Sequence, residues 1–184
     1  PARTRAGRNN DEARAAWKEL FDEIYIQRSV PGHSPIMNLR PSFQRSTSYH
    51  SSIRFNYEND KLREVIDHLL AADGHGPSYE FDLVNLTRQY LSNRFEQRFA
   101  DYKAAYEKGD TAEMAALKDE LLGTFDTLEE LLGSQPYFLV GKWIADARSW
   151  GADATEADYF ESNARNLVTT WGDRGHTVTD KAER

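Results

Sequence analysis

Hydrophobic side chains recur every three or four residues through most of this chain, which is the period of an amphipathic α-helix. The two clearest stripes are Val84, Leu91, Phe95, Phe99, Tyr102 and Tyr106, then Met114, Leu117, Leu121, Phe125, Leu128 and Leu132. Between them, Gly109 fits a helix C-terminus and Asp110-Thr-Ala-Glu113 fits a capping box that opens the next helix. The pattern predicts a central antiparallel αα-hairpin formed by residues of about 79–108 and 110–132.

The same period predicts four further helices, at about residues 11–28, 58–72, 140–150 and 153–171. Their apolar faces include all four tryptophans: Trp17, Trp143, Trp150 and Trp171. The first eight residues are basic and poor in helix signals, and residues 29–55 are rich in Pro, Ser and Arg without any period. We interpret residues 29–55 as a long irregular loop, which in a compact domain is usually functional or packed on another part. With no strand-hairpin signal, the sequence predicts an all-α, bundle-like fold.

Composition narrows the class of protein further. The 184 residues, 39% hydrophobic and 29% charged, fit one domain over residues 1–184 with a core of its own, and exclude a disordered chain. No apolar run approaches a membrane span, and the net charge of −7 argues against nucleic acid as a partner. With no cysteine, thiol catalysis, cysteine-based zinc sites and disulfides are all excluded.

A search for catalytic chemistry returns little. The five histidines have no metal-binding spacing, and no phosphate-binding loop or nucleophile elbow occurs, so we predict no catalytic residue, no metal site and no cofactor. His68 lies one helical turn after Glu64, and we interpret it as structural. Glu129 and Glu130 are neighbours on one helix and therefore point in different directions.

Aromatic and amide side chains near the C-terminus are the one suggestive group. Tyr159, Asn163, Asn166 and Thr170 share a shoulder of the last predicted helix, Arg165 projects the other way, and Trp143 and Trp150 lie on the helix before. An indole can stack on the apolar face of a sugar while amides bind its hydroxyl groups. The alternative is that the tryptophans belong to the core and the amides to an ordinary helix surface. The residues alone leave both interpretations open.

Several phrases resemble the C-terminal helical domain of the α-N-acetylglucosaminidases, a family of glycoside hydrolases. They keep the family's order and span nearly the whole chain: Asn10-Asp-Glu-Ala-Arg-Ala-Ala-Trp17-Lys-Glu-Leu20, Leu39-Arg-Pro-Ser42, Phe81-Asp-Leu-Val-Asn-Leu-Thr-Arg-Gln-Tyr-Leu91, Phe138-Leu-Val-Gly-Lys-Trp-Ile144, Ala157-Asp-Tyr-Phe-Glu-Ser-Asn-Ala-Arg165 and Thr170-Trp-Gly172. The third phrase and the last two are the most specific.

The resemblance implies a function for the whole polypeptide. In the family, a helical domain packs on a catalytic barrel that carries both catalytic glutamates and hydrolyses terminal α-linked N-acetylglucosamine with retention. The barrel is therefore expected before Pro1, and this chain alone is expected to be inactive. Its partners would be that barrel and an N-acetylglucosamine-terminated glycan. Trp143 is the residue we expect in the sugar pocket, followed by Asn163 and Arg165, which could instead organise the helix pair.

The match also has departures. Arg3-Thr-Arg5-Ala-Gly7 stands where the family tends to have Arg-Tyr-Gly, and Thr179-Asp180-Lys-Ala-Glu-Arg184 lacks the family's usual tyrosine. The family domain continues past this point, so we expect a piece of a longer polypeptide. Because the chain has no cysteine, we expect a secreted or periplasmic bacterial protein rather than a lysosomal one. The alternative function is a helical protein-interaction module without an enzymatic role.

Overall fold

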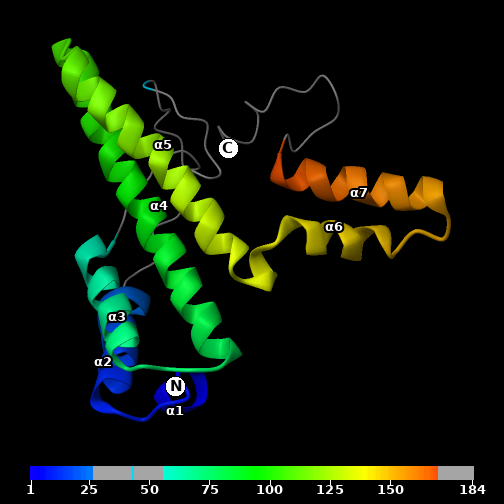
Figure 1. Ribbon diagram of the computed structural model, residues 1–184, viewed down its shortest axis with the longest axis horizontal. Helices are drawn as coiled ribbons and strands as arrows, with labels where there is room; N and C mark the ends of the chain where they lie inside the picture. Colours follow the sequence, from blue (N-terminus) through cyan, green and yellow to red (C-terminus); the bar gives the residue numbers. More distant parts are fainter. Residues whose placement is uncertain (27–42, 44–55, 170–184) are drawn as a thin grey trace.

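The computed structural model describes residues 1–26, 43 and 56–169, and this part of the chain contains helices and no strand. The predicted all-α class is therefore confirmed (Figure 1). The predicted loop 29–55, apart from Phe43, lies outside the described residues, as do Thr170 and Trp171. The elements are α1 (Ala2–Arg5), α2 (Asp11–Glu19), η1 (Leu20–Tyr25), α3 (Asn59–Ala71), α4 (Pro77–Lys108), α5 (Thr111–Gly133), η3 (Pro136–Phe138), α6 (Val140–Arg148) and α7 (Ala154–Val168).

The main core lies where α2, η1 and α3 pack on the first half of α4. Apolar residues three and four apart along α3 bury Leu62, Val65 and Leu69 almost completely, and Leu20 and Leu86 close the cluster from η1 and α4. Burial of one such side chain is worth about 1.5–3 kcal/mol. Helix α2 begins at Asn10, whose side chain accepts a hydrogen bond from the Ala13 amide at 2.9 Å. This core fixes the N-terminal end of the long helix α4.

Helices α4 and α5 lie side by side along most of the molecule (Figure 1). The chain reverses at Gly109, which has a φ of 71°, and Asp110 then caps α5 by accepting from the Glu113 amide at 3.0 Å. Phe95 of α4 packs with Leu121 of α5 in another apolar cluster. The centroid of the Phe95 ring lies 5.1 Å from that of Phe125, also on α5. Helix α4 is therefore packed on α3 at one end and on α5 at the other.

Several elements differ from the sequence-based predictions. Residues Ala2–Arg5 form a helical turn where we expected little helix, and Leu20–Tyr25 continue α2 as a π-helix. Trp150 was placed within the predicted helix 140–150, but α6 ends at Arg148 and the Trp150 ring is 79% exposed. His68 of α3 pairs with Glu12 of α2 at 2.6 Å, a partner that the sequence did not indicate, in keeping with its predicted structural role.

The last two helices form a separate hairpin. Figure 1 shows α6 and α7 lying against each other to one side of the α4–α5 hairpin, beyond the end of α5, and their main packing is on one another. The short turn η3 makes the connection from α5. This hairpin carries the candidate residues of the sequence analysis, so it is the place to look for a functional site.

Candidate functional site

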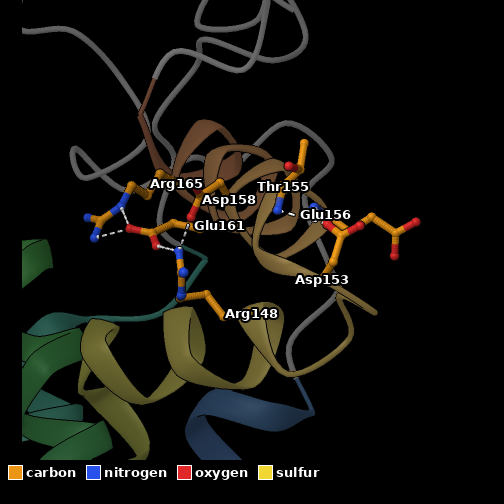
Figure 2. Close-up of polar contacts among 7 residues, drawn as sticks. All are labelled: Arg148, Asp153, Thr155, Glu156, Asp158, Glu161 and Arg165. Atoms are coloured by element: carbon orange, nitrogen blue, oxygen red, sulfur yellow. Dashed lines mark hydrogen bonds and ion pairs between the residues drawn. The ribbon is translucent and has the colours of Figure 1, made fainter.

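The turn between α6 and α7 is built by local hydrogen bonds. Asp153 caps α7 by accepting from the amides of Thr155 at 2.8 Å and Glu156 at 3.0 Å (Figure 2). Glu156 in turn accepts from the Ala152 amide at 2.9 Å. These bonds satisfy amides that a helix N-terminus otherwise leaves without partners. At Gly151, an added Cβ would lie 2.3 Å from the Ala157 backbone nitrogen. The backbone of the turn and the backbone of α7 approach so closely at Gly151 that only glycine fits.

An ionic cluster then holds the two helices together. Arg148 of α6 donates Nη1 to Asp158 Oδ1 at 2.7 Å and to Glu161 Oε2 at 2.5 Å, and Arg165 donates Nε to the other Glu161 oxygen at 2.7 Å (Figure 2). The Glu161 carboxylate is thus bracketed by two guanidinium groups, one from each helix. The bonds from Arg148 and Arg165 hold the pKa of the Glu161 carboxyl below its ordinary value.

Arg165 is therefore placed differently from the other two candidate residues. Its guanidinium is engaged by Glu161 of its own helix, so it contributes to the clamp that fixes α7 on α6. Asn163 lies on the exposed surface of α7, and Trp143 lies on α6 with 38% of its surface exposed. Within the described residues, Trp143 forms no hydrogen bond, ring contact or cation–π contact with Asn163 or Arg165. The hairpin brings the three residues onto adjacent, packed helices.

The hairpin and its connection also expose a large aromatic and aliphatic surface. Trp143 is accompanied by side chains that are 44–79% exposed: Tyr137, Leu139, Val140, Trp150, Tyr159, Leu167 and Val168. Single exposed apolar residues are normal on a protein surface, but so many on one short hairpin are typical of a region that a partner covers. We call this group of exposed side chains, with Trp143, the aromatic face of the hairpin, although Tyr159 and Val168 project from opposite sides of α7.

Some groups were missed by sequence reasoning. The clamp residue Arg148 meets Glu161 thirteen positions later, and pairing them from the sequence requires the register of the turn at Gly151. Two absences can also be stated for the residues that the structure describes. None of its helices combines the length and apolarity needed to cross a membrane, and its histidines and carboxylates form no group of three or more suited to a metal ion.

The fold and the aromatic face together define the class: an all-helical domain that presents an apolar hairpin beside its core. The chain belongs to a known family, since residues 2–184 match the family described as the alpha-N-acetylglucosaminidase (NAGLU) C-terminal domain.

Named relatives agree with this assignment. The chain is 31% identical over 185 residues to the human protein named alpha-N-acetylglucosaminidase, covering 96% of this chain and 24% of that protein. It also resembles CpGH89 from Clostridium perfringens, solved in complex with its substrate GlcNAc-alpha-1,4-galactose, with a TM-score of 0.80 and 27% identity over 98% of this chain. A family 89 glycoside hydrolase from the same organism, in complex with PUGNAc, gives a TM-score of 0.81 and 27% identity. The chain spans about a fifth to a quarter of these relatives, 21% and 24%.

Proposed function

We propose that this domain is the C-terminal part of a retaining α-N-acetylglucosaminidase, and that it packs on a catalytic barrel of the same polypeptide. Membership of the family and the names of the relatives support this reading. The barrel would supply both catalytic carboxyl groups, which in a retaining enzyme lie about 5–5.5 Å apart. The substrate would be a glycan that ends in α-linked N-acetylglucosamine. For the polypeptide that carries the domain we keep the expectation of a secreted or periplasmic bacterial location.

The role we propose for this domain is to brace the barrel and to form one wall of the sugar pocket through Trp143. The observation that carries the proposal is the aromatic face, on a hairpin that stands beside the core rather than within it. Apolar area of this kind is stabilised when a partner covers it. An indole that is 38% exposed keeps both an edge fixed by the domain and a surface free to meet a sugar. Asn163 and Arg165 are weaker candidates for the same pocket.

Kinetics of the whole polypeptide test the role of Trp143. We expect Trp143→Ala to reduce kcat/KM for an aryl α-N-acetylglucosaminide by about 10²-fold or more, as misplacing a substrate can, while the melting temperature changes little. The comparison variant is Trp150→Ala, which removes a more exposed ring of the same face past the end of α6 and should weaken packing on the barrel without the same loss of kcat/KM. Unchanged kinetics with a lowered melting temperature would make Trp143 a packing residue. If the complete polypeptide carries no domain that cleaves sugars, the alternative function, a helical protein-interaction module, would be favoured.

A further inference from the structure

Arg88 is a half-buried cation at the junction of α4 and η3. Its Nη2 donates to Asn85 Oδ1 at 2.9 Å, and its guanidinium carbon lies 5.9 Å from the centre of the Phe138 ring. The Nε atom is buried and has no hydrogen-bond partner within residues 1–26, 43 and 56–169. Nη1 also donates to nothing in that part of the chain, and it is not among the buried atoms. Nη2 of the Arg88 guanidinium therefore makes one hydrogen bond, while Nη1 and the second hydrogen of Nη2 remain available as donors.

The lack of a counter-ion sets Arg88 apart from comparable side chains. In the part of the chain that the structure describes, every other half-buried arginine or lysine lies within salt-bridge distance of a carboxylate; these are Arg5, Lys61, Arg98, Lys103 and Arg148. Burial lowers the pKa of Arg88, but a guanidinium stays charged at any physiological pH. A half-buried charge without an opposite charge is costly, so a partner for Arg88 would stabilise the domain.

Another arginine of the domain, Arg5, shows how a guanidinium pairs with a carboxylate on α4. Nearly two turns earlier on α4, Asp82 accepts from Nε and Nη2 of Arg5, each at 2.5 Å. That pair shows how a planar guanidinium binds a carboxylate through two parallel hydrogen bonds. Arg88 offers a comparable pair of donors, Nη1 and the free hydrogen of Nη2, at a surface of the domain, with no carboxylate in place among the described residues.

The surroundings of Arg88 resemble the centre of a protein–protein contact. Phe138 stacks on Phe81 with centroids 5.4 Å apart, and its chain neighbours Tyr137 and Leu139 are 74% and 44% exposed. Arginine and aromatic residues are the types that most often dominate the binding energy of protein interfaces. A protein carboxylate therefore fits this place better than a free anion does.

We propose that Arg88 receives an aspartate or glutamate side chain from the catalytic domain, which would pack over the α4–η3 junction. The inference rests on the proposed function for the existence of that domain, and it adds the chemistry of one contact. The carboxylate would take Nη1 and a free hydrogen of Nη2, while Asn85 and Phe138 hold the guanidinium plane in position. Arg88 is in this view a positioning residue, which sets how the aromatic face is presented to the barrel.

The test compares Arg88→Met in two settings, the 184-residue chain and the complete polypeptide. In the chain alone we expect the melting temperature to stay unchanged or rise, because an uncompensated half-buried charge has been removed. In the complete polypeptide we expect the transition of this domain to fall by about 2–4 °C, because the partner carboxylate loses its counter-ion. Arg88→Lys should recover part of that loss, since lysine keeps the charge without the planar fork.

Arg94→Met is the matched control. Arg94 lies on the same helix and pairs with Glu120 inside the domain at 2.7 Å, so its loss should act alike in both settings. Equal effects of Arg88→Met in the two settings would overturn the proposal. So would a variant that leaves the polypeptide stable but raises KM only for a sulfated or carboxylated glycoside, because the anion would then belong to the substrate. Turnover of a neutral aryl α-N-acetylglucosaminide by the unaltered polypeptide is scored separately, and its absence would count against the proposed function alone.

Discussion

Arg5 and Asp82 are 77 residues apart in sequence and form a two-bond ion pair that joins α1 to α4. Asp82 is only 9% exposed, so both of its oxygens depend on Arg5 for hydrogen bonds that water would otherwise provide. The bonds to Asp82 raise the pKa of Arg5 above its already high value. This pair therefore adds to the burial of Ala2 and Ala6 in holding the N-terminal helix on the domain.

We expect Asp82→Asn to lower the free energy of unfolding by about 1–3 kcal/mol, because the amide cannot accept both bonds and Arg5 loses its counter-ion. Urea unfolding of the 184-residue chain measures this difference. Asp67→Asn is the control, since Asp67 forms an exposed pair with Arg63 at 3.6 Å that should contribute less than about 1 kcal/mol. Equal effects from the two variants would show that burial does not strengthen the Arg5–Asp82 pair.

At the scale of elements, α4 and α5 depend on an apolar seam that the sequence predicts well. Leu121 is 7% exposed and packs with Phe95, whereas its neighbour Leu122 is 55% exposed on the far side of α5. We expect Leu121→Ala to destabilise the domain by about 2–5 kcal/mol through lost burial and a residual cavity. Leu122→Ala should stay within about 0.5 kcal/mol of the unaltered chain. Chemical unfolding of the two variants measures this difference. A similar loss of unfolding free energy in both would contradict the inward position of Leu121.

The clamp on the α6–α7 hairpin makes a prediction about acid. The pKa of Glu161 is lowered from 4.5, chiefly by the hydrogen bond from Arg148 and then by that from Arg165. A lowered carboxyl pKa gives stability that is present above pH 4.5 and is lost as the pH falls below that value. We therefore expect hydrogen-exchange protection of α6 and α7 to decrease between pH 5 and pH 3.

Glu161→Gln supplies the control for this prediction, because it removes the titrating group and should leave a hairpin whose protection no longer follows that transition. Glu19 in the main core is an internal comparison. Burial, and then Glu64, raise its pKa, so its contribution favours the folded state at low pH and is lost as the pH rises through the raised value. Protection lost equally in α2 and in α7 would mean general acid unfolding rather than release of the clamp.

The helices that the sequence predicted best are those whose ends carry clear capping residues. Gly109 and Asp110 separate α4 from α5, and the capping position at Asp153 opens α7, so local chemistry alone fixes those ends. The helical turn α1 has no such signal, because it is held by a distant residue, Asp82. Periodicity placed Trp150 on an apolar stripe but could not say whether another element covers that stripe, and the ring is 79% exposed.

In the candidate site, too, the sequence predicted which helices carry the residues but not their contacts. The sequence placed Trp143, Asn163 and Arg165 on consecutive helices, and the structure adds that Arg165 belongs to a clamp with Arg148. That clamp depends on the register of two antiparallel helices, which no spacing in the sequence reveals. Arg88 stands within the phrase Phe81 to Leu91 that resembles the family, but nothing in the sequence indicates that it lacks a counter-ion, because that depends on where the carboxylates of other elements lie.

For the whole molecule, the central feature is an imbalance between its two ends. Helices α1 to α5 bury several apolar clusters between them, whereas α6 and α7 pack chiefly on each other and present the aromatic face to one side. The chain also corresponds to 24% of its human relative and 21% of the solved bacterial chains. These facts fit a domain whose exposed hairpin is completed by another part of the polypeptide.

The most direct test of this account is an activity assay of the complete polypeptide on an aryl α-N-acetylglucosaminide, with the 184-residue chain assayed beside it. The account predicts turnover by the complete polypeptide and none by the chain alone, because both catalytic carboxyl groups would lie outside this domain. Turnover by the chain alone would contradict it by requiring a catalytic carboxylate pair within residues 1–184. No turnover by either would contradict the proposed function and favour a helical interaction module.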